Sequence, residues 1–110
     1  MTREIKFYES YFINFYMSLD SSIQEKIEYV FKLIRTTEMI PQKFLSHIAG
    51  TDGLYEIRIK ESGNIYRIFC CFDADRIVVL FNGFHKKSQK TPQKEIDKAL
   101  RIKRDYFNKI

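Results

Sequence analysis

The most regular alternation of hydrophobic and polar positions lies between Leu54 and Phe72. After Leu54, residues 55–60 carry tyrosine and isoleucine at odd positions and charged side chains at even positions, which is the period of a half-buried β-strand. Residues 65–72 continue as a second, more apolar strand. The glycine and asparagine between them accept the positive φ angles of a tight turn. The pattern therefore predicts a β-hairpin that turns at Ser62-Gly63 or at Gly63-Asn64.

The register of this hairpin decides which charged residues share a face. Either two-residue turn places Arg58 and Arg67 on one face, and the turn at Ser62-Gly63 places them directly opposite each other. A three-residue loop would put Arg67 among the isoleucines, so the apolar pattern favours the shorter loop. Two facing cations repel each other unless an anion lies between them. Glu56 or a phosphate, which arginine binds with two N–H groups, could take that place. Arginines on a solvated sheet face with Glu56 as partner are the alternative.

Two amphipathic helices are predicted ahead of the hairpin. Apolar and aromatic residues recur at helical spacing over residues 11–19 and 22–35, after a short strand at Ile5–Phe7. Ser22 and Glu25 stand three residues apart, as in a capping box. The two helices are expected to form an antiparallel hairpin across one face of the sheet.

The remaining segments supply a connection, a third long strand and a last helix. Residues 36–52 are expected to connect the helices to the sheet through a short helical turn at residues 44–48. After a turn at residues 73–75, residues 76–84 are continuously apolar at their centre, as in a strand covered on both sides. Thr91 as cap and Pro92 at the first helical position then start a helix that ends near Phe107.

Length and composition bound the class of protein. A chain of 110 residues that is 45% hydrophobic is long enough for one core and too short for two. The order β-α-α-β-β-β-α predicts a single α+β domain over residues 1–110, with an antiparallel sheet cradled by the N-terminal helical hairpin. No signal-like or membrane-spanning stretch and no zinc-like Cys/His spacing occur in the sequence, and the side chains of Cys70 and Cys71 should point to opposite faces of one strand. We therefore expect a reduced, cytoplasmic protein without metal or cofactor.

Charge indicates the kind of partner. A net charge of +5, from 19 Lys and Arg against 14 Asp and Glu, favours a polyanion. The densest cationic segment follows the third strand. It holds His85, Lys86, Lys87 and Lys90, with Ser88, Gln89 and Thr91 as further donors. A helix start directly after it adds unpaired N–H groups and the positive end of the helix dipole. The segment predicts phosphate binding, with a solubilising loop as the alternative.

Three stretches carry a family resemblance. They are F-L-S-H-I-A-G-T-D-G-L-Y-E-I-R-I at residues 44–59, Y-R-I in the second strand, and G-F-H-K-K-S-Q-K-T-P at residues 83–92. Together they resemble the RelE/ParE toxin superfamily, in particular the HigB-like, phage-related branch of toxin–antitoxin systems. The resemblance implies a microbial-ribonuclease-like fold and an endoribonuclease that cuts mRNA on the ribosome and so inhibits translation. It also implies a helix-turn-helix antitoxin that holds the toxin inactive in a hetero-oligomer.

Cleavage of RNA through its 2′-hydroxyl needs a base, charge stabilisation at phosphorus and an acid for the leaving 5′-oxygen. The arginines suit the stabilisation, a histidine suits the proton transfers, and a lysine can act if neighbouring cations lower its pKa. The candidate catalytic residues are therefore Arg58, Arg67, Lys86, Lys87 and His85, with Glu56 orienting Arg58. The candidate RNA-binding and phosphate-binding residues are Lys60, Gln89, Lys90 and Thr91.

Two other functions fit the same sequence. A ParE-like poison of DNA gyrase would share the fold without nuclease chemistry, since a fold does not determine a function. A non-catalytic RNA-binding or ribosome-binding module would use the same basic face, with steep salt dependence and no cleaved product. The paired arginines and the cationic segment favour the nuclease.

Overall fold

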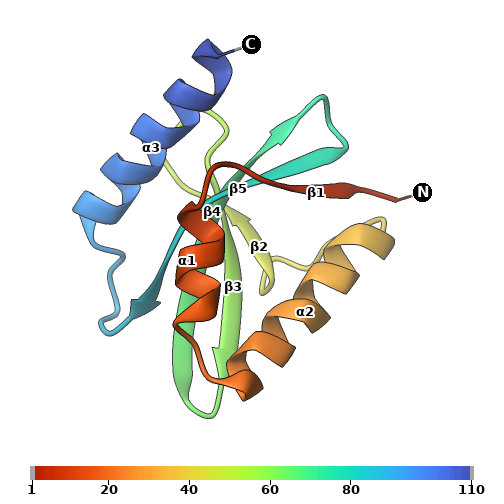
Figure 1. Cartoon of the computed structure of the whole chain (residues 1–110), viewed down its shortest axis with the longest axis vertical. Coiled ribbons are helices and arrows are strands. Elements are labelled where there is room, and N and C mark those ends of the chain that lie inside the picture. The colour runs from red at the N-terminus through yellow and green to blue at the C-terminus, as the bar shows by residue number, and fades with distance from the viewer. Residues whose placement is uncertain (1, 110) are drawn as a thin grey trace.

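A short N-terminal strand and a helical hairpin precede four further strands and a last helix in the computed structural model, which describes residues 2–109 (Figure 1). The strands are β1 (Glu4–Phe7), β2 (Leu45–His47), β3 (Tyr55–Glu61), β4 (Asn64–Asp73) and β5 (Ile77–Lys86). The helices are α1 (Tyr11–Met17), α2 (Ser21–Thr36) and α3 (Gln93–Asn108). None of the helices within this described range has the length and apolarity needed to cross a membrane.

The five strands form one sheet in the order β1-β5-β4-β3-β2. The predicted α+β class is confirmed, and β3, β4 and β5 pair antiparallel as expected. The sheet is nevertheless mixed, because β1 pairs parallel with β5. The predicted helical turn at residues 44–48 was wrong: Leu45 pairs with Ile57 in an extra edge strand. The backbone of this strand pairs with part of the exposed edge of β3. A helical turn at these residues would have left that edge unpaired.

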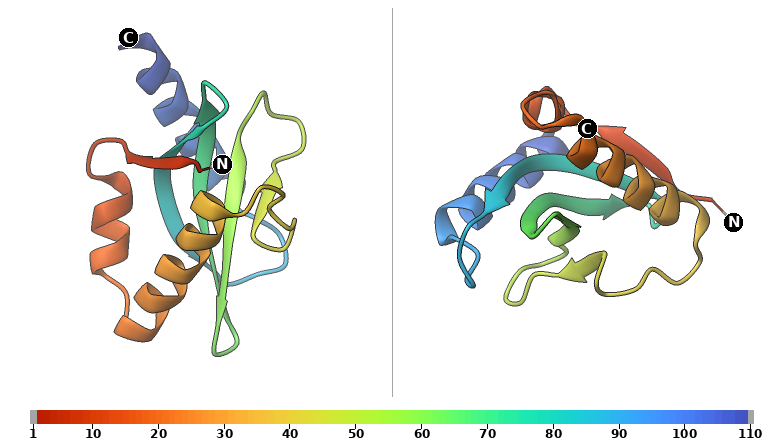
Figure 2. Two further views of the ribbon diagram at one scale, coloured as in Figure 1. Left: turned by 90° about the vertical axis from the view of Figure 1, so that its right-hand side faces the viewer. Right: turned by 90° about the horizontal axis from the view of Figure 1, so that it is seen from below.

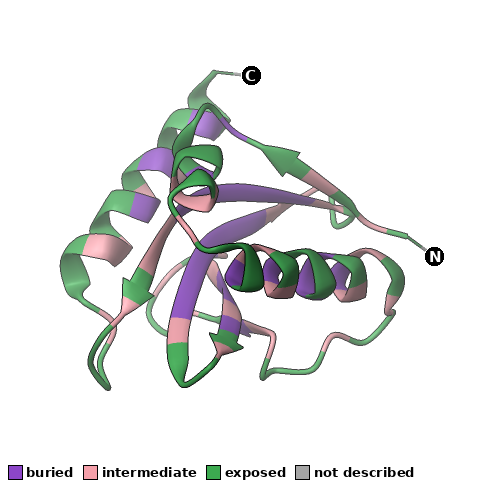
Figure 3. Ribbon diagram, turned by 60° about the horizontal axis from the view of Figure 1, so that its bottom comes forward, coloured by how far each residue is buried: buried purple, intermediate pink, exposed green. Residues whose placement is uncertain are grey.

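The sheet separates two apolar cores (Figure 2). The predicted helical hairpin covers one face, where α1 and α2 pack on residues such as Ile57 and Ile68. Helix α3 covers the opposite face over β4 and β5, where it packs on Phe69 and Phe81. Buried residues accordingly run along the strands and on the inner stripes of the helices (Figure 3). On the α3 side, α3 packs mainly on β5 and β4, and the charged residues of the hairpin lie on the neighbouring face of β3.

The β3–β4 hairpin has one of the two predicted registers. Its turn lies at Ser62-Gly63, with φ of 53° and 80°, the left-handed pair of a type I′ turn. Arg58 is directly opposite Arg67. Because Arg67 lies between Ile65 and Phe69 on alternate positions of β4, both arginines face the α3 side of the sheet.

Two helices begin at different residues than predicted. Helix α2 begins at Ser21 after Asp20, so Ser22 is not its cap and the capping box does not form. Helix α3 begins at Gln93, and Pro92 rather than Thr91 is its N-cap. Neither N-cap makes a side-chain hydrogen bond, so packing of the apolar stripes, rather than capping, holds these helices in place.

Gly83 allows α1 to lie close to β5. A Cβ atom at this position would stand 2.5 Å from Cδ2 of Phe15, well inside van der Waals contact. Gly83→Ala is therefore expected to displace the Phe15 ring and to lower the free energy of unfolding by about 1–3 kcal/mol, as measured by urea denaturation. Adding Phe15→Leu should recover part of the loss. Wild-type stability of the single variant would contradict this close approach.

Candidate nucleic-acid interface

Glu56 lies between the two arginines of the hairpin. Arg58 directs Nε and Nη2 at Glu56 Oε2, each at 2.9 Å. Arg67 Nε lies 3.3 Å from Glu56 Oε1, but its N–H is not aligned for a hydrogen bond, so this contact is an ion pair only. The carboxylate thus offsets the repulsion that two facing cations would otherwise feel. Of the two anions considered from the sequence, Glu56 occupies the place between the guanidinium groups.

This triad is unequally buried. Glu56 and Arg67 are 4% and 9% exposed, whereas the side chain of Arg58 is 36% exposed. Burial lowers the pKa of Arg67, and Arg58 adds to this effect while Glu56 opposes it. An arginine with a lowered pKa is still charged at neutral pH. Two guanidinium groups against one carboxylate therefore leave a net positive charge on this face.

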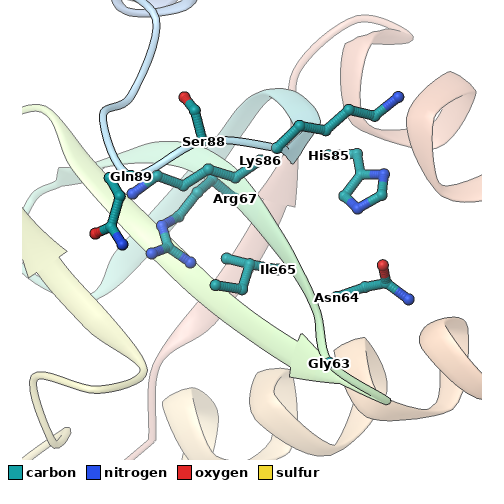
Figure 4. Close-up of a pocket in the computed structure, with 9 residues that line it drawn as sticks. Gly63, Asn64, Ile65, Arg67, His85, Lys86, Ser88 and Gln89 are labelled. Carbon is teal, nitrogen blue, oxygen red and sulfur yellow. The ribbon is translucent and has the colours of Figure 1, made fainter.

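The end of β5 determines which residue of the cationic segment lies beside the arginines. The strand extends to Lys86, two residues beyond the predicted end at residue 84. Lys86 pairs with Ile65 on the face of Arg67, whereas His85 pairs with Tyr66. The His85 ring stacks on the Tyr66 ring at 4.6 Å between centroids, on the face of the helical hairpin. Figure 4 shows the imidazole directed away from the Arg67 guanidinium.

A β-bulge in β5 causes this division. Two steps along β4, from Ile68 to Cys70, oppose three steps along β5, from Leu80 to Gly83. The extra residue reverses the side of the sheet on which every later residue of β5 lies. Strict alternation from Leu80 would have placed His85 beside the arginines and Lys86 under the helices. The structure therefore brings Lys86, and not His85, to the arginine pair.

Lys86 is a lysine whose pKa is lowered by burial and by neighbouring cations, as a lysine acid or base requires. Burial lowers its pKa, the positive charges of Arg67 and Arg58 lower it further, and Glu56 opposes the shift. A lower pKa raises the fraction of neutral amine near physiological pH. Lys86 is thus a lysine with a larger neutral fraction, the form that can act as a base, beside two guanidinium groups suited to a phosphate.

An open groove of about 710 Å³ lies between the β3–β4 turn and the segment after β5 (Figure 4). It has the size of a small-ligand site. Of the residues selected from the sequence, it is lined by Arg67, His85, Lys86, Lys87 and Gln89. A second hollow, on the β3 side of Arg67, is lined by Arg58 and Lys60. The two hollows share Arg67 and Ile65, so they form one cationic surface with the arginines at its centre.

Some selected residues lie outside this surface. Lys90 and Thr91 line neither hollow. The first turn of α3 carries Glu95, whose Oε1 accepts a hydrogen bond from Asn82 Nδ2 at 3.3 Å, so a carboxylate lies at the helix start that was expected to attract phosphate. Residues 2–109 contain no cluster of His, Cys, Asp and Glu that could hold a metal ion.

Sequence reasoning also missed two cations of this surface. Lys26 of α2 and Lys43 of the connection line the second hollow. Each is a single lysine outside any cationic run, and no pattern distinguishes it from lysines elsewhere. Only the packing of α2 and of the connection against β3 brings them beside Arg58.

Comparisons with known proteins agree with the fold. A family model described as phage-derived protein Gp49-like matches residues 14–104. Five chains of solved structures match, among them one in the crystal structure of the archaeal RelE–RelB complex from Pyrococcus horikoshii OT3. That match has 20% identity and a TM-score of 0.53, and it covers 77% of this chain and 96% of that chain. No curated protein matches. The family and the RelE-like fold that the sequence resembles are therefore confirmed.

Proposed function

The chain belongs to the Gp49-like family of phage-derived proteins, and from this membership and its RelE-like fold we propose that it is the toxin of a toxin–antitoxin system, an endoribonuclease that cleaves mRNA on the ribosome. One observation carries the proposal. Arg58 and Arg67 are held side by side by Glu56, with Lys86 of lowered pKa on the same face. RelE in the archaeal structure is in complex with RelB, so the expected partner here is an antitoxin protein, of the helix-turn-helix type that the sequence resemblance implies.

In the proposed reaction the two arginines bind the phosphate that is cut. Glu56 engages Nε and Nη2 of Arg58 and lies against Nε of Arg67. Within residues 2–109, Nη1 of Arg58 and Nη2 of Arg67 make no hydrogen bond. These donors can bind phosphate oxygens and stabilise the negative charge that develops on them in the transition state. Glu56 is thus a positioning residue that keeps the guanidinium groups of both arginines in place.

Lys86 is the proposed base. Its neutral amine would take the proton of the 2′-hydroxyl, whose oxygen then attacks phosphorus and displaces the 5′-oxygen. Lys87 lines the same groove and is the proposed donor of a proton to that leaving oxygen. His85 receives no role in this reaction, because its ring stacks on Tyr66 on the opposite face of the sheet.

The proposed role of Lys86 sets a pH dependence. The cleavage rate is expected to rise with pH above neutrality, because the neutral fraction of Lys86 grows, and to level off below pH 10.5, the ordinary lysine value from which its pKa is lowered. Lys86→Arg keeps the positive charge but cannot lose a proton in this range, so its rate should be low and independent of pH. Lys94→Arg on α3 is the control. A Lys86→Arg profile that rises like that of the wild type would remove Lys86 as the base.

The experiment that tests the function is primer extension on a defined mRNA in a translating extract. New 5′ ends within the reading frame that require ribosomes would establish a ribosome-dependent nuclease. Intact mRNA from a protein that stops growth and traps gyrase on cleaved DNA would indicate the gyrase poison instead. Intact mRNA with RNA binding that weakens steeply with salt would indicate a passive binding module.

A further inference from the structure

The second hollow opens at the edge of the sheet beside Arg58. It has a volume of about 340 Å³. Strand β2 pairs with β3 only as far as Ile57, and the Arg58 N–H donates to the carbonyl of Phe44 at 2.8 Å. Beyond this point no strand of residues 2–109 covers the edge of β3. The hollow therefore adjoins the arginine pair and remains open to a ligand.

The walls of this hollow are positively charged. Five of its lining residues are cationic and none is acidic. Besides the two arginines these are Lys26, Lys43 and Lys60, of which Lys43 and Lys60 are exposed. Like charges held around one concave surface raise the local positive potential and favour an anion. Glu56 offsets one of these charges through its contacts with the arginines, which leaves an excess of positive charge around the hollow.

The hollow also offers backbone and aromatic contacts. The alternation that directs the Arg58 N–H at Phe44 directs the Lys60 N–H to the same open edge, where it can donate to a phosphate. The Phe44 ring is half-buried, and Lys43 Nζ lies 5.0 Å from its centroid. The same ring face can stack on a base when Lys43 turns from it to bind a phosphate.

We propose that this hollow is a nucleotide subsite for single-stranded RNA next to the phosphate that is cut. Lys43 and Lys60 bind the neighbouring phosphate, with Lys26 contributing charge, and the base stacks on Phe44. An unpaired strand is required, because a base in a duplex cannot turn its face to an aromatic side chain. The inference rests on the proposed function, in which Arg58 and Arg67 bind the phosphate between the two hollows.

Binding of short RNAs tests this subsite. Fluorescein-labelled 2′-O-methyl oligouridylates of two and of six nucleotides cannot be cut through a 2′-hydroxyl, and fluorescence anisotropy gives their affinities at several salt concentrations. Lys43→Gln with Lys60→Gln is expected to weaken binding of the six-nucleotide probe at least fivefold and to reduce its salt slope by about 0.7, because the neighbouring phosphate is no longer neutralised. Phe44→Leu keeps the side chain apolar and should weaken binding about fivefold or more, with an unchanged slope.

Lys32→Gln with Lys98→Gln is the matched control, since it removes two exposed charges from α2 and α3. It should change the affinity for the six-nucleotide probe less than twofold. The inference is overturned if the subsite variants bind that probe like the control, or if the wild-type chain does not bind it. Either result leaves ribosome-dependent cleavage to be judged separately by primer extension. Conversely, if the subsite variants show the expected losses of affinity and the wild-type protein cuts no mRNA, the subsite is supported and the nuclease is overturned.

Discussion

Arg58→Ala is expected to reduce ribosome-dependent mRNA cleavage about 100-fold or more, the loss typical of removing one preorganised donor to a developing oxyanion. The fold should remain, because the Arg58 side chain is 36% exposed and the buried Glu56 carboxylate keeps Arg67 as its counter-ion when Arg58 is removed. Primer extension measures the cleavage, and urea denaturation measures the stability.

Two further variants make this result specific. Arg101→Ala removes the same side chain from the exposed face of α3 and should leave cleavage unchanged. Arg58→Lys keeps the charge but loses the planar fork, so it should retain only part of the activity. Cleavage and growth arrest at wild-type levels in Arg58→Ala would show that the arginine pair does not bind the phosphate that is cut.

Glu56→Gln is expected to lower the free energy of unfolding by about 3 kcal/mol. Glutamine has nearly the same size, but it leaves the Arg67 guanidinium, 9% exposed, without a counter-ion and facing Arg58. Adding Arg67→Met removes the buried charge as well and should restore much of the lost stability. Glu28→Gln, at an exposed position of α2, is the control for loss of a surface carboxylate.

The same variant also reports on anion binding. Inorganic phosphate should raise the stability of Glu56→Gln more than that of the wild type, because an anion can then enter between Arg58 and Arg67 and binds only the folded state. Urea denaturation with and without phosphate measures the difference. If Glu56→Gln were as stable as the wild type, the ion pair between Glu56 and Arg67 would be too weak to hold the forks in place.

The helical hairpin and the hairpin of strands were predictable because their signals are local. Apolar residues three and four apart predicted α1 and α2, and the alternation of apolar and charged residues around Gly63 predicted β3 and β4. Errors arose where a distant segment decided the outcome. The backbone of residues 45–47 became a strand because the edge of β3 was there to pair with it, and β1 joined the sheet parallel to β5.

The sequence alone determined that Arg58 and Arg67 share one face of the sheet, because either two-residue turn and a period of two put them there. The structure decided that the turn lies at Ser62-Gly63, which places the two arginines directly opposite each other. The sequence also located the cationic segment after β5. Only the tertiary structure decided how that segment meets the arginines. An extra residue in β5, opposite Ile68 and Cys70, turns Lys86 toward them and His85 away, and whether a strand bulges depends on the packing of both its faces. Packing of α2 and the connection against β3 likewise brought Lys26 and Lys43 to the site, since side chains far apart in sequence meet only when the core forms.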